Sequence, residues 1–171
     1  MKTIVEVYDA DNRRPEIMEQ AGEILKSGGL VAFPTETVYG LGGDALNPEA
    51  SAKIYAAKGR PSDNPLIVHI ADMEALKVLA SEVPEKARLL ADRFWPGPLT
   101  MIMPKSDAVP YATTGGLDTV AIRMPSHPTA YELIRSYRSW YISGHPSANT
   151  SGRPSPTTAQ HVYEDLNGRL I

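Results

Sequence analysis

The 171-residue chain contains no cysteine, which excludes a disulfide framework and a thiolate metal site. Its four histidines lie far apart and show no metal-binding spacing. The formal net charge is −3, so the chain lacks the global positive field of a nucleic-acid coat protein. No apolar run approaches membrane-spanning length, and the N-terminus lacks the apolar core of a signal peptide. We therefore expect a cytoplasmic protein without membrane attachment, in which any anion site arises from local clustering of charge.

Short apolar runs alternate with segments of helical periodicity along the chain. Strands are expected at 4–8, 30–33, 66–70, 99–103, 119–124 and 137–142. Helices are expected at about 15–27, 48–58, 73–80, 84–94, 128–136 and 158–166. This alternation predicts an α/β domain with a twisted, partly parallel sheet. Proline and glycine concentrate in 28–43, 59–65, 96–116 and 144–156, which predicts long ordered loops between short elements, one of them at 104–116.

The stretch 58–70, KGRPSDNPLIVHI, joins a polar loop stiffened by proline to an apolar strand. The loop carries Lys58 and Arg60, together with the hydrogen-bonding side chains of Ser62 and Asn64. Because the buried strand that follows holds this loop in place, we expect it to present fixed positive charge. Fixed cations of this kind suit the phosphates of a nucleotide.

Two further segments are open to a structural and a functional interpretation. The stretch 34–44, PTETVYGLGGD, is either a glycine-rich turn or the mouth of a polar small-molecule pocket, and it matches neither the Walker loop nor the GxGxxG fingerprint. Thr119 and Arg123 share one face of an alternating strand. The arginine therefore forms either an edge-strand salt bridge or a contact for a phosphate or carboxylate. His69, beside a strand end, is more typical of a structural histidine than of a base.

The segment 143–158, SGHPSANTSGRPSPTT, is either a low-complexity linker or an ordered loop with further polar ligands. As a loop it would contribute Ser147, Asn149 and Ser155. The candidate residues are thus cations and hydroxyl or amide groups, without a nucleophile constellation. This inventory suits phosphoryl or nucleotidyl transfer, and it suits the binding of an RNA backbone almost as well.

Five motifs together resemble the YrdC-like family of threonylcarbamoyl-AMP synthases, in the order PTETVYGLGGDA, KGRPSDNPLIVHI, FWPGPLT, TVAIRMPSHP and PSANTSGRPSPTTA. The resemblance implies a YrdC-like twisted mixed sheet with flanking helices around a large basic cavity. It implies that residues 1–171 form one domain, incomplete at its C-terminal end. It also implies a nucleotidyltransferase that makes threonylcarbamoyl-AMP and pyrophosphate from L-threonine, bicarbonate and ATP, with Mg²⁺ accompanying ATP. The product would supply a tRNA-modification machinery that acts on adenosine.

The resemblance further implies roles for individual residues. The implied ATP contacts are Lys58, Arg60, Ser62, Asn64, Thr119, Ser147, Asn149 and Ser155, and Lys58 and Arg60 are also the implied catalytic residues. The implied L-threonine contacts are Thr35, His69, Arg123 and His145. A carbamate formed from threonine is itself an anionic nucleophile, so the protein has mainly to offset the repulsion between this carbamate and the α-phosphate.

The chain departs from the family pattern in two places. Bulky residues at 137–145, among them Arg138, Trp140 and Tyr141, are expected to crowd or remodel the threonine pocket. The chain also ends before the family's next strand–helix segment, so we expect weakened or lost activity. Two other functions stay open. One is an RNA-binding module that uses the same basic cavity without catalysis. The other is a relative that transfers carbamoyl groups, although such domains usually belong to longer chains with cysteines.

Overall fold

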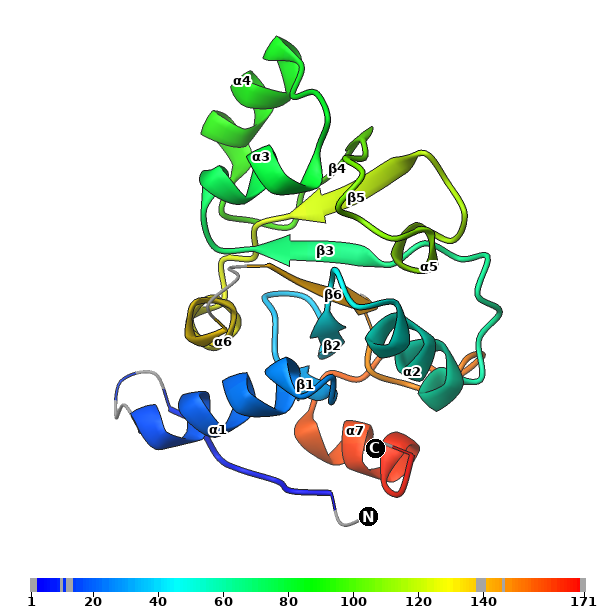
Figure 1. Ribbon diagram of the computed structural model, residues 1–171. Coiled ribbons are helices and arrows are strands. Elements are labelled where there is room, and N and C mark those ends of the chain that lie inside the picture. Colours follow the sequence, from blue (N-terminus) through cyan, green and yellow to red (C-terminus); the bar gives the residue numbers. More distant parts are fainter. Residues whose placement is uncertain (1–2, 10, 12–13, 138–140, 146, 170–171) are drawn as a thin grey trace.

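A computed structural model describes residues 3–9, 11, 14–137, 141–145 and 147–169, and its centre is a six-stranded sheet (Figure 1). The strands are β1 (Val31–Phe33), β2 (Gly40–Asp44), β3 (Ile67–Ile70), β4 (Thr100–Pro104), β5 (Thr119–Arg123) and β6 (Tyr141–His145). They follow the order β1-β2-β6-β3-β5-β4. Neighbouring strands are antiparallel, except that β3 and β5 are parallel. The prediction of a mixed α/β sheet is therefore confirmed.

The helices begin and end largely where local chemistry predicts. They are α1 (Pro15–Lys26), α2 (Pro48–Lys58), the 3₁₀ turn η1 (Met73–Ala75), α3 (Leu76–Leu79), α4 (Glu85–Phe94), α5 (Tyr111–Thr114), α6 (Pro128–Ser136) and α7 (Ala159–Leu166). Helix α2 shows the logic clearly. The Asn47 side chain accepts a hydrogen bond from the backbone N–H of Glu49 at 2.9 Å, and Gly59 ends the helix at a φ of 60°.

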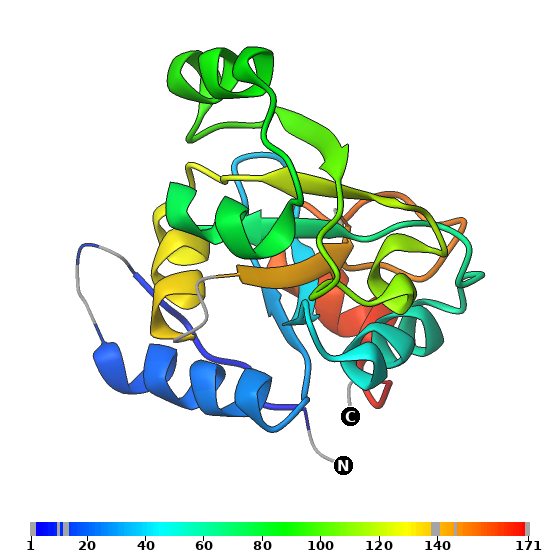
Figure 2. The same ribbon diagram turned by 45° about the horizontal axis from the view of Figure 1, so that its top comes forward.

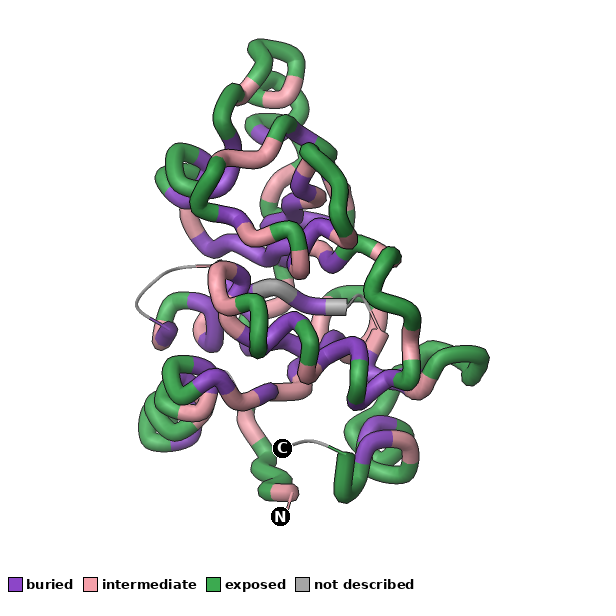
Figure 3. Tube along the Cα trace, turned by 45° about the vertical axis from the view of Figure 1, so that its right-hand side comes forward, coloured by how far each residue is buried: buried purple, intermediate pink, exposed green. Residues whose placement is uncertain are grey.

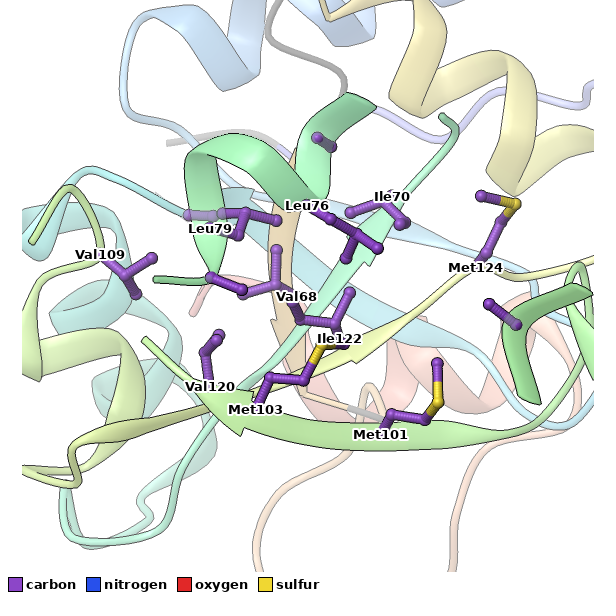
Figure 4. Packing of buried hydrophobic residues seen from close by; sticks show 14 residues of the cluster. Val68, Ile70, Leu76, Leu79, Met101, Met103, Val109, Val120, Ile122 and Met124 are labelled. Atoms are coloured by element: carbon purple, nitrogen blue, oxygen red, sulfur yellow. The ribbon is translucent and has the colours of Figure 1, made fainter. Parts of the chain in front are cut away.

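One face of the sheet, called here the packed face, is covered by helices. Val68, Ile122 and Met103 lie on this face and pack against Leu76 and Leu79 of α3 (Figure 4). Further along the sheet, Leu41 packs in a second cluster with residues of α2 and α7. Burial follows the same plan, since the strands are mostly buried while the helices expose their outer sides (Figure 3). The packed face thus holds much of the core.

The opposite face, called the open face, is covered only in part. At one end Phe33 and Ile142 pack against α1 and α6, which lie side by side in Figure 1. Across the middle runs a row in which Gly42 pairs with Gly144 and which continues through Ile67 to Ala121, so that Ile67 is the one large side chain of these four residues. Glycine and alanine leave the backbone of a sheet within reach of a ligand. Beyond this row, on edge strand β4, Ile102 is 71% exposed.

Several sequence predictions were wrong, mostly about strands. Residues 4–8 form no strand in the structure. Residues 40–44, interpreted as loop, form β2 in the middle of the β1–β2–β6 pairing. Of the strand expected at 137–142, residues 141 and 142 belong to β6, which continues to His145, so the loop expected from 143 begins after it. In each case pairing with distant strands, rather than local propensity, decides the outcome.

Smaller differences concern helices and the C-terminal residues. The helix expected at 73–80 is divided into η1 and the four-residue α3, and a short helix, α5, lies inside the loop expected at 104–116. Helix α4 buries only Ala91 and projects at the top of Figure 1. Residues 138–140 lie outside the described part of the chain, as do the side chains of Ser143 and His145. No described helix is both long enough and apolar enough to span a membrane.

Candidate functional site

The 34–39 loop leaves β1 and forms a tight turn centred on Thr35. The Thr35 hydroxyl donates to the carbonyl of Val38 at 2.7 Å and accepts the backbone N–H groups of Thr37 and Val38 at 3.2 and 3.3 Å. A threonine can replace missing backbone partners in this way, so its first task is to shape the turn. The turn places Glu36 beside β5, 87 positions away along the chain.

Arg123 is the last residue of β5 and lies on the open face. Its side chain is 5% exposed. The Nε–H group donates to the carbonyl of Gly97 at 3.2 Å, and an Nη2–H group donates to Oε1 of Glu36 at 2.5 Å. Arg123 is also paired in register with His69 on β3. Hydrogen bonds to two loops therefore fix the position of the guanidinium. A specific contact with a carboxylate or phosphate requires such a fixed position.

His69 is buried and stays uncharged. Burial lowers the pKa of His69 to about 4, and the positive charge of Arg123 contributes to the lowering. Its Nδ1–H group donates to the carbonyl of Ile67 at 3.2 Å, and its ring meets Phe33 edge-on with centroids 5.8 Å apart. These contacts are typical of a structural histidine, and His69 lies next to Arg123 on the neighbouring strand. A neutral imidazole at this position adds no charge to the site.

Lys58 ends α2 and fastens the last loop to it. Its ammonium is buried and donates to the carbonyl of Asn149 at 2.6 Å, and also to the carbonyl of Ser147. The backbone carbonyl of Lys58 accepts the N–H of Ser151 at 2.9 Å. Burial, followed by the positive charge of Arg60, lowers the pKa of Lys58 to about 8, so most of the ammonium remains charged at neutral pH. The predicted phosphate ligand thus also organises the loop next to it.

The 59–65 loop is held by its backbone and leaves its side chains accessible. The Tyr55 hydroxyl donates to the carbonyl of Asn64 at 2.6 Å. A Cβ added to Gly115 would lie 2.8 Å from the carbonyl oxygen of Asp63, so the loop packs directly on the end of α5. Arg60 and Asn64 are half-buried, and Ser62 is exposed. This part of the predicted phosphate site is therefore fixed in place and open to solvent.

The 147–157 loop is ordered by specific contacts and is not a linker. The backbone N–H of Ala148 donates to the carbonyl of Tyr39 at 2.6 Å, and the N–H of Tyr39 donates to the carbonyl of Pro156 at 2.9 Å. Asn149 is buried and its amide donates to the carbonyl of Arg153 at 2.8 Å. The 34–39 loop therefore joins the Arg123 end of the site to the Lys58 end.

The structure brings most of the predicted residues into one continuous network. Lys58, Ser147 and Asn149 are in direct contact, and Arg60 interacts electrostatically with Lys58. His69, Arg123 and Thr35 lie together at the other end, joined through Glu36. Thr119 lies on the same face of β5 as Arg123, four residues away. Ser62 and Ser155 are exposed, and the side chain of His145 lies outside the described part of the chain.

Sequence reasoning assigned no role to Glu36, Tyr39, Tyr55 or the carbonyl of Gly97. The sequence held a signal only for a partner of Arg123, because a guanidinium on an apolar strand needs a hydrogen-bonding or charged partner when it is buried. A cavity of about 720 Å³ lies elsewhere, between residues 3–8, α1, β1 and α7, and none of the described candidate residues lines it. This cavity is therefore not the predicted basic cavity, and the basic cavity stays a prediction.

Known proteins are similar to this chain over the residues that form the candidate site. The sequence profile of the family described as Telomere recombination (Sua5_yciO_yrdC) matches residues 23–171. The chain belongs to the Sua5/YciO/YrdC family. Two relatives named threonylcarbamoyl-AMP synthase, from Pyrococcus abyssi and Bacillus subtilis, are 58% and 55% identical over 88% and 99% of the chain. The chain spans about half the length of these relatives, at 44% and 50%.

Solved structures of the Sua5/YciO/YrdC family agree with the fold described above. The crystal structure of P. abyssi Sua5 complexed with L-threonine has a TM-score of 0.89 and 54% sequence identity. The match covers 97% of this chain and 47% of that one. The likeness therefore extends through both ends of the candidate site. It agrees with the family resemblance carried by the five motifs.

A protein-bound metal cage is not evident at the site. Among the residues that the structure describes, no three histidine, aspartate or glutamate side chains gather closely enough to hold a metal ion. Mg²⁺ commonly binds with one or two protein carboxylates and several oxygens from substrate phosphates and water. Mg²⁺ bound together with ATP therefore stays a prediction.

Proposed function

We propose that this chain is a nucleotidyltransferase that makes threonylcarbamoyl-AMP from L-threonine, bicarbonate and the Mg²⁺ complex of ATP. The observation that carries the proposal is the match of 97% of this chain, at 54% sequence identity, to about half of the P. abyssi Sua5 structure complexed with L-threonine. The names of the related synthases give the same activity. We further propose that the reaction takes place in the cytoplasm and supplies a tRNA-modification machinery, which transfers the threonylcarbamoyl group to adenosine.

The proposed reaction needs charge placement rather than a protein nucleophile. The amino group of threonine loses a proton to solvent, and the neutral amine then attacks bicarbonate; water leaves, which gives a carbamate. A carbamate oxygen then attacks the α-phosphorus of ATP, and pyrophosphate leaves. Both partners of the second step are anions, so fixed cations lower its barrier by offsetting their repulsion. In this proposal Arg60, with Ser62 and Asn64 beside it, receives the phosphates from the solvent side, and Lys58 holds the adjoining loop and adds its charge.

The amino-acid side of the proposed site is the Arg123 end. Its guanidinium binds the carboxylate of threonine, with His69 and Thr35 beside it. Thr119, Ser147, Asn149 and Ser155 are proposed to line the nucleotide side. Nothing observed in the described residues favours the RNA-binding alternative over the synthase.

The experiment is an assay of pyrophosphate release by the 171-residue chain. Release should require ATP, L-threonine and bicarbonate together, and omission of any one should abolish it. Arg60→Ala should reduce kcat/KM by about 10-fold or more, as expected for a charged hydrogen bond. Arg88→Ala changes the same charge on the exposed side of α4 and serves as the matched control. Release without threonine, or full activity of the Arg60 variant, would refute the proposal.

A further inference from the structure

Glu36 is the acidic side chain in contact with the buried Arg123, and the roles described above leave it unused. Its Oε1 accepts a hydrogen bond from Nη2 of Arg123 at 2.5 Å. The side chain of Glu36 is 21% exposed, whereas that of Arg123 is 5% exposed. Glu36 is thus the outer member of the pair. A ligand that reaches Arg123 from solution therefore also meets the carboxylate of Glu36.

The pair is neutral as a whole. Burial raises the pKa of Glu36, but hydrogen bonds from Arg123 and from backbone N–H groups outweigh it, so the pKa is lowered and the carboxylate is ionised at neutral pH. His69 beside the pair is uncharged. In the described part of the chain, no other charged side chain is recorded in contact with either group. The site therefore presents one positive and one negative charge next to each other.

Both members of the pair keep unused hydrogen-bonding capacity. A guanidinium has five N–H donors, and Arg123 uses one for Gly97 and one for Glu36. Its other three have no recorded partner among the described residues. A carboxylate accepts about four hydrogen bonds, and Glu36 receives those of Arg123, its own backbone and the backbone of Ser126. A ligand can therefore bind to each group without breaking the ion pair.

We infer, on the basis of the function proposed above, that Glu36 is a specificity-determining residue that binds the ammonium group of an α-amino acid whose carboxylate binds Arg123. An α-amino acid in water carries these two opposite charges on adjacent atoms of its backbone. The ion pair of the protein offers the matching charges side by side. A plain carboxylate brings a second negative charge next to Glu36 and provides nothing to balance it, so the same pair rejects such a ligand.

The experiment compares two ligands by titration calorimetry on the full chain. One is L-threonine, and the other is (R)-3-hydroxybutanoate, which keeps the carboxylate and the hydroxyl but lacks the amine. In Glu36→Gln the amide oxygen still accepts a hydrogen bond from Arg123, but the negative charge is lost. The wild-type preference for threonine should fall by about 10-fold or more in this variant. Glu74→Gln, which removes an exposed carboxylate on η1, should keep the wild-type preference.

Each other outcome overturns the inference in a recognisable way. A parallel loss of affinity for both ligands means that Glu36 only orients Arg123. A parallel gain means that Glu36 competes with the ligand's carboxylate. A wild-type chain that binds neither ligand refutes the proposed function together with the inference, whereas threonine binding with an unchanged preference in the variant refutes the inference alone.

A second measurement on the wild-type chain covers the case in which Glu36→Gln does not fold. At a pH near the pKa of the threonine amine, binding of the ammonium form takes up protons. Calorimetry in buffers of different ionisation enthalpy measures this uptake. Proton release on binding would overturn the inference, because it would mean that the neutral amine is the bound form.

Discussion

Acidification should destabilise this protein because His69 is fully buried and its protonated form would lie beside the positive charge of Arg123, effects that outweigh the opposite charge of Glu36. The pKa of His69 is about 4 in the folded chain, against 6.5 for a free histidine. Below pH 6.5 the unfolded chain binds a proton that the folded chain excludes, so stability falls as the pH drops toward 4. Between about pH 7.5 and about pH 5 the loss from this one group is about 2 kcal/mol, and it approaches about 3 kcal/mol at lower pH.

Urea unfolding, followed by far-UV circular dichroism at the two pH values, measures this loss. His69→Asn keeps a side-chain N–H that can reach the carbonyl of Ile67, but it cannot be protonated. The variant should be less stable than wild type at the higher pH, because it loses the ring contact with Phe33. Its loss of stability between the two pH values should nevertheless be smaller than that of wild type by about 2 kcal/mol.

The matched control replaces a histidine that the fold leaves exposed. His161 lies on the outer side of α7, and His161→Asn should keep the wild-type loss of stability on acidification. NMR titration of the imidazole C–H signals tests the same point directly. If the ring of His69 gained its proton near pH 6.5, or if His69→Asn lost as much stability as wild type, the reasoning about its burial would be refuted.

Three further predictions concern the site loops, the sheet and the surface. Lys58→Met leaves two backbone carbonyls without a donor and should lower the free energy of unfolding by about 1–3 kcal/mol. The free energy of unfolding of Arg60→Met should stay within about 0.5 kcal/mol of wild type. Titration with ATP should show weaker binding in both variants. Gly43→Ala places a Cβ 3.0 Å from Cδ2 of Leu30, and the overpacking should cost about 1–3 kcal/mol in urea unfolding; an unchanged midpoint would contradict the close packing. Lys77→Ala breaks only an exposed ion pair and should change stability by less than about 0.5 kcal/mol, so a larger change would show that this pair has a structural role.

Elements with a local signal could be predicted from the sequence. Helix α2 has a capping asparagine before it and a glycine after it, and β5 alternates over its length. Strand β2 carries no such signal, because its first four residues are three glycines and one leucine, a composition that suggests a loop. It forms a strand since both neighbours pair with it and α2 leaves no room for larger side chains at Gly43. Residues 4–8 show the reverse case: the alternation is present, but no strand pairs with them.

The site was predictable as a set of residues but not as a set of contacts. The cations and hydroxyl groups stand in recognisable motifs, and the network joins most of them. The sequence could not indicate that the ammonium of Lys58 is directed at two carbonyls of a loop about 90 positions away. A buried arginine calls for an acidic partner, yet the chain has 20 aspartate and glutamate residues. The path of the 34–39 loop selects Glu36, and this path depends on the whole sheet.

The strand order has a consequence for how the chain is made on the ribosome. Among the residues that the structure describes, β6 is the last strand along the chain, but it lies between β2 and β3 and joins the two halves of the sheet (Figure 2). Until residues 141–145 leave the exit tunnel, the nascent chain holds two partial sheets whose inner edges are unpaired. Unpaired edges of this kind are where nascent chains aggregate or recruit chaperones. Residues 141–145 must therefore be synthesised before this sheet can be completed.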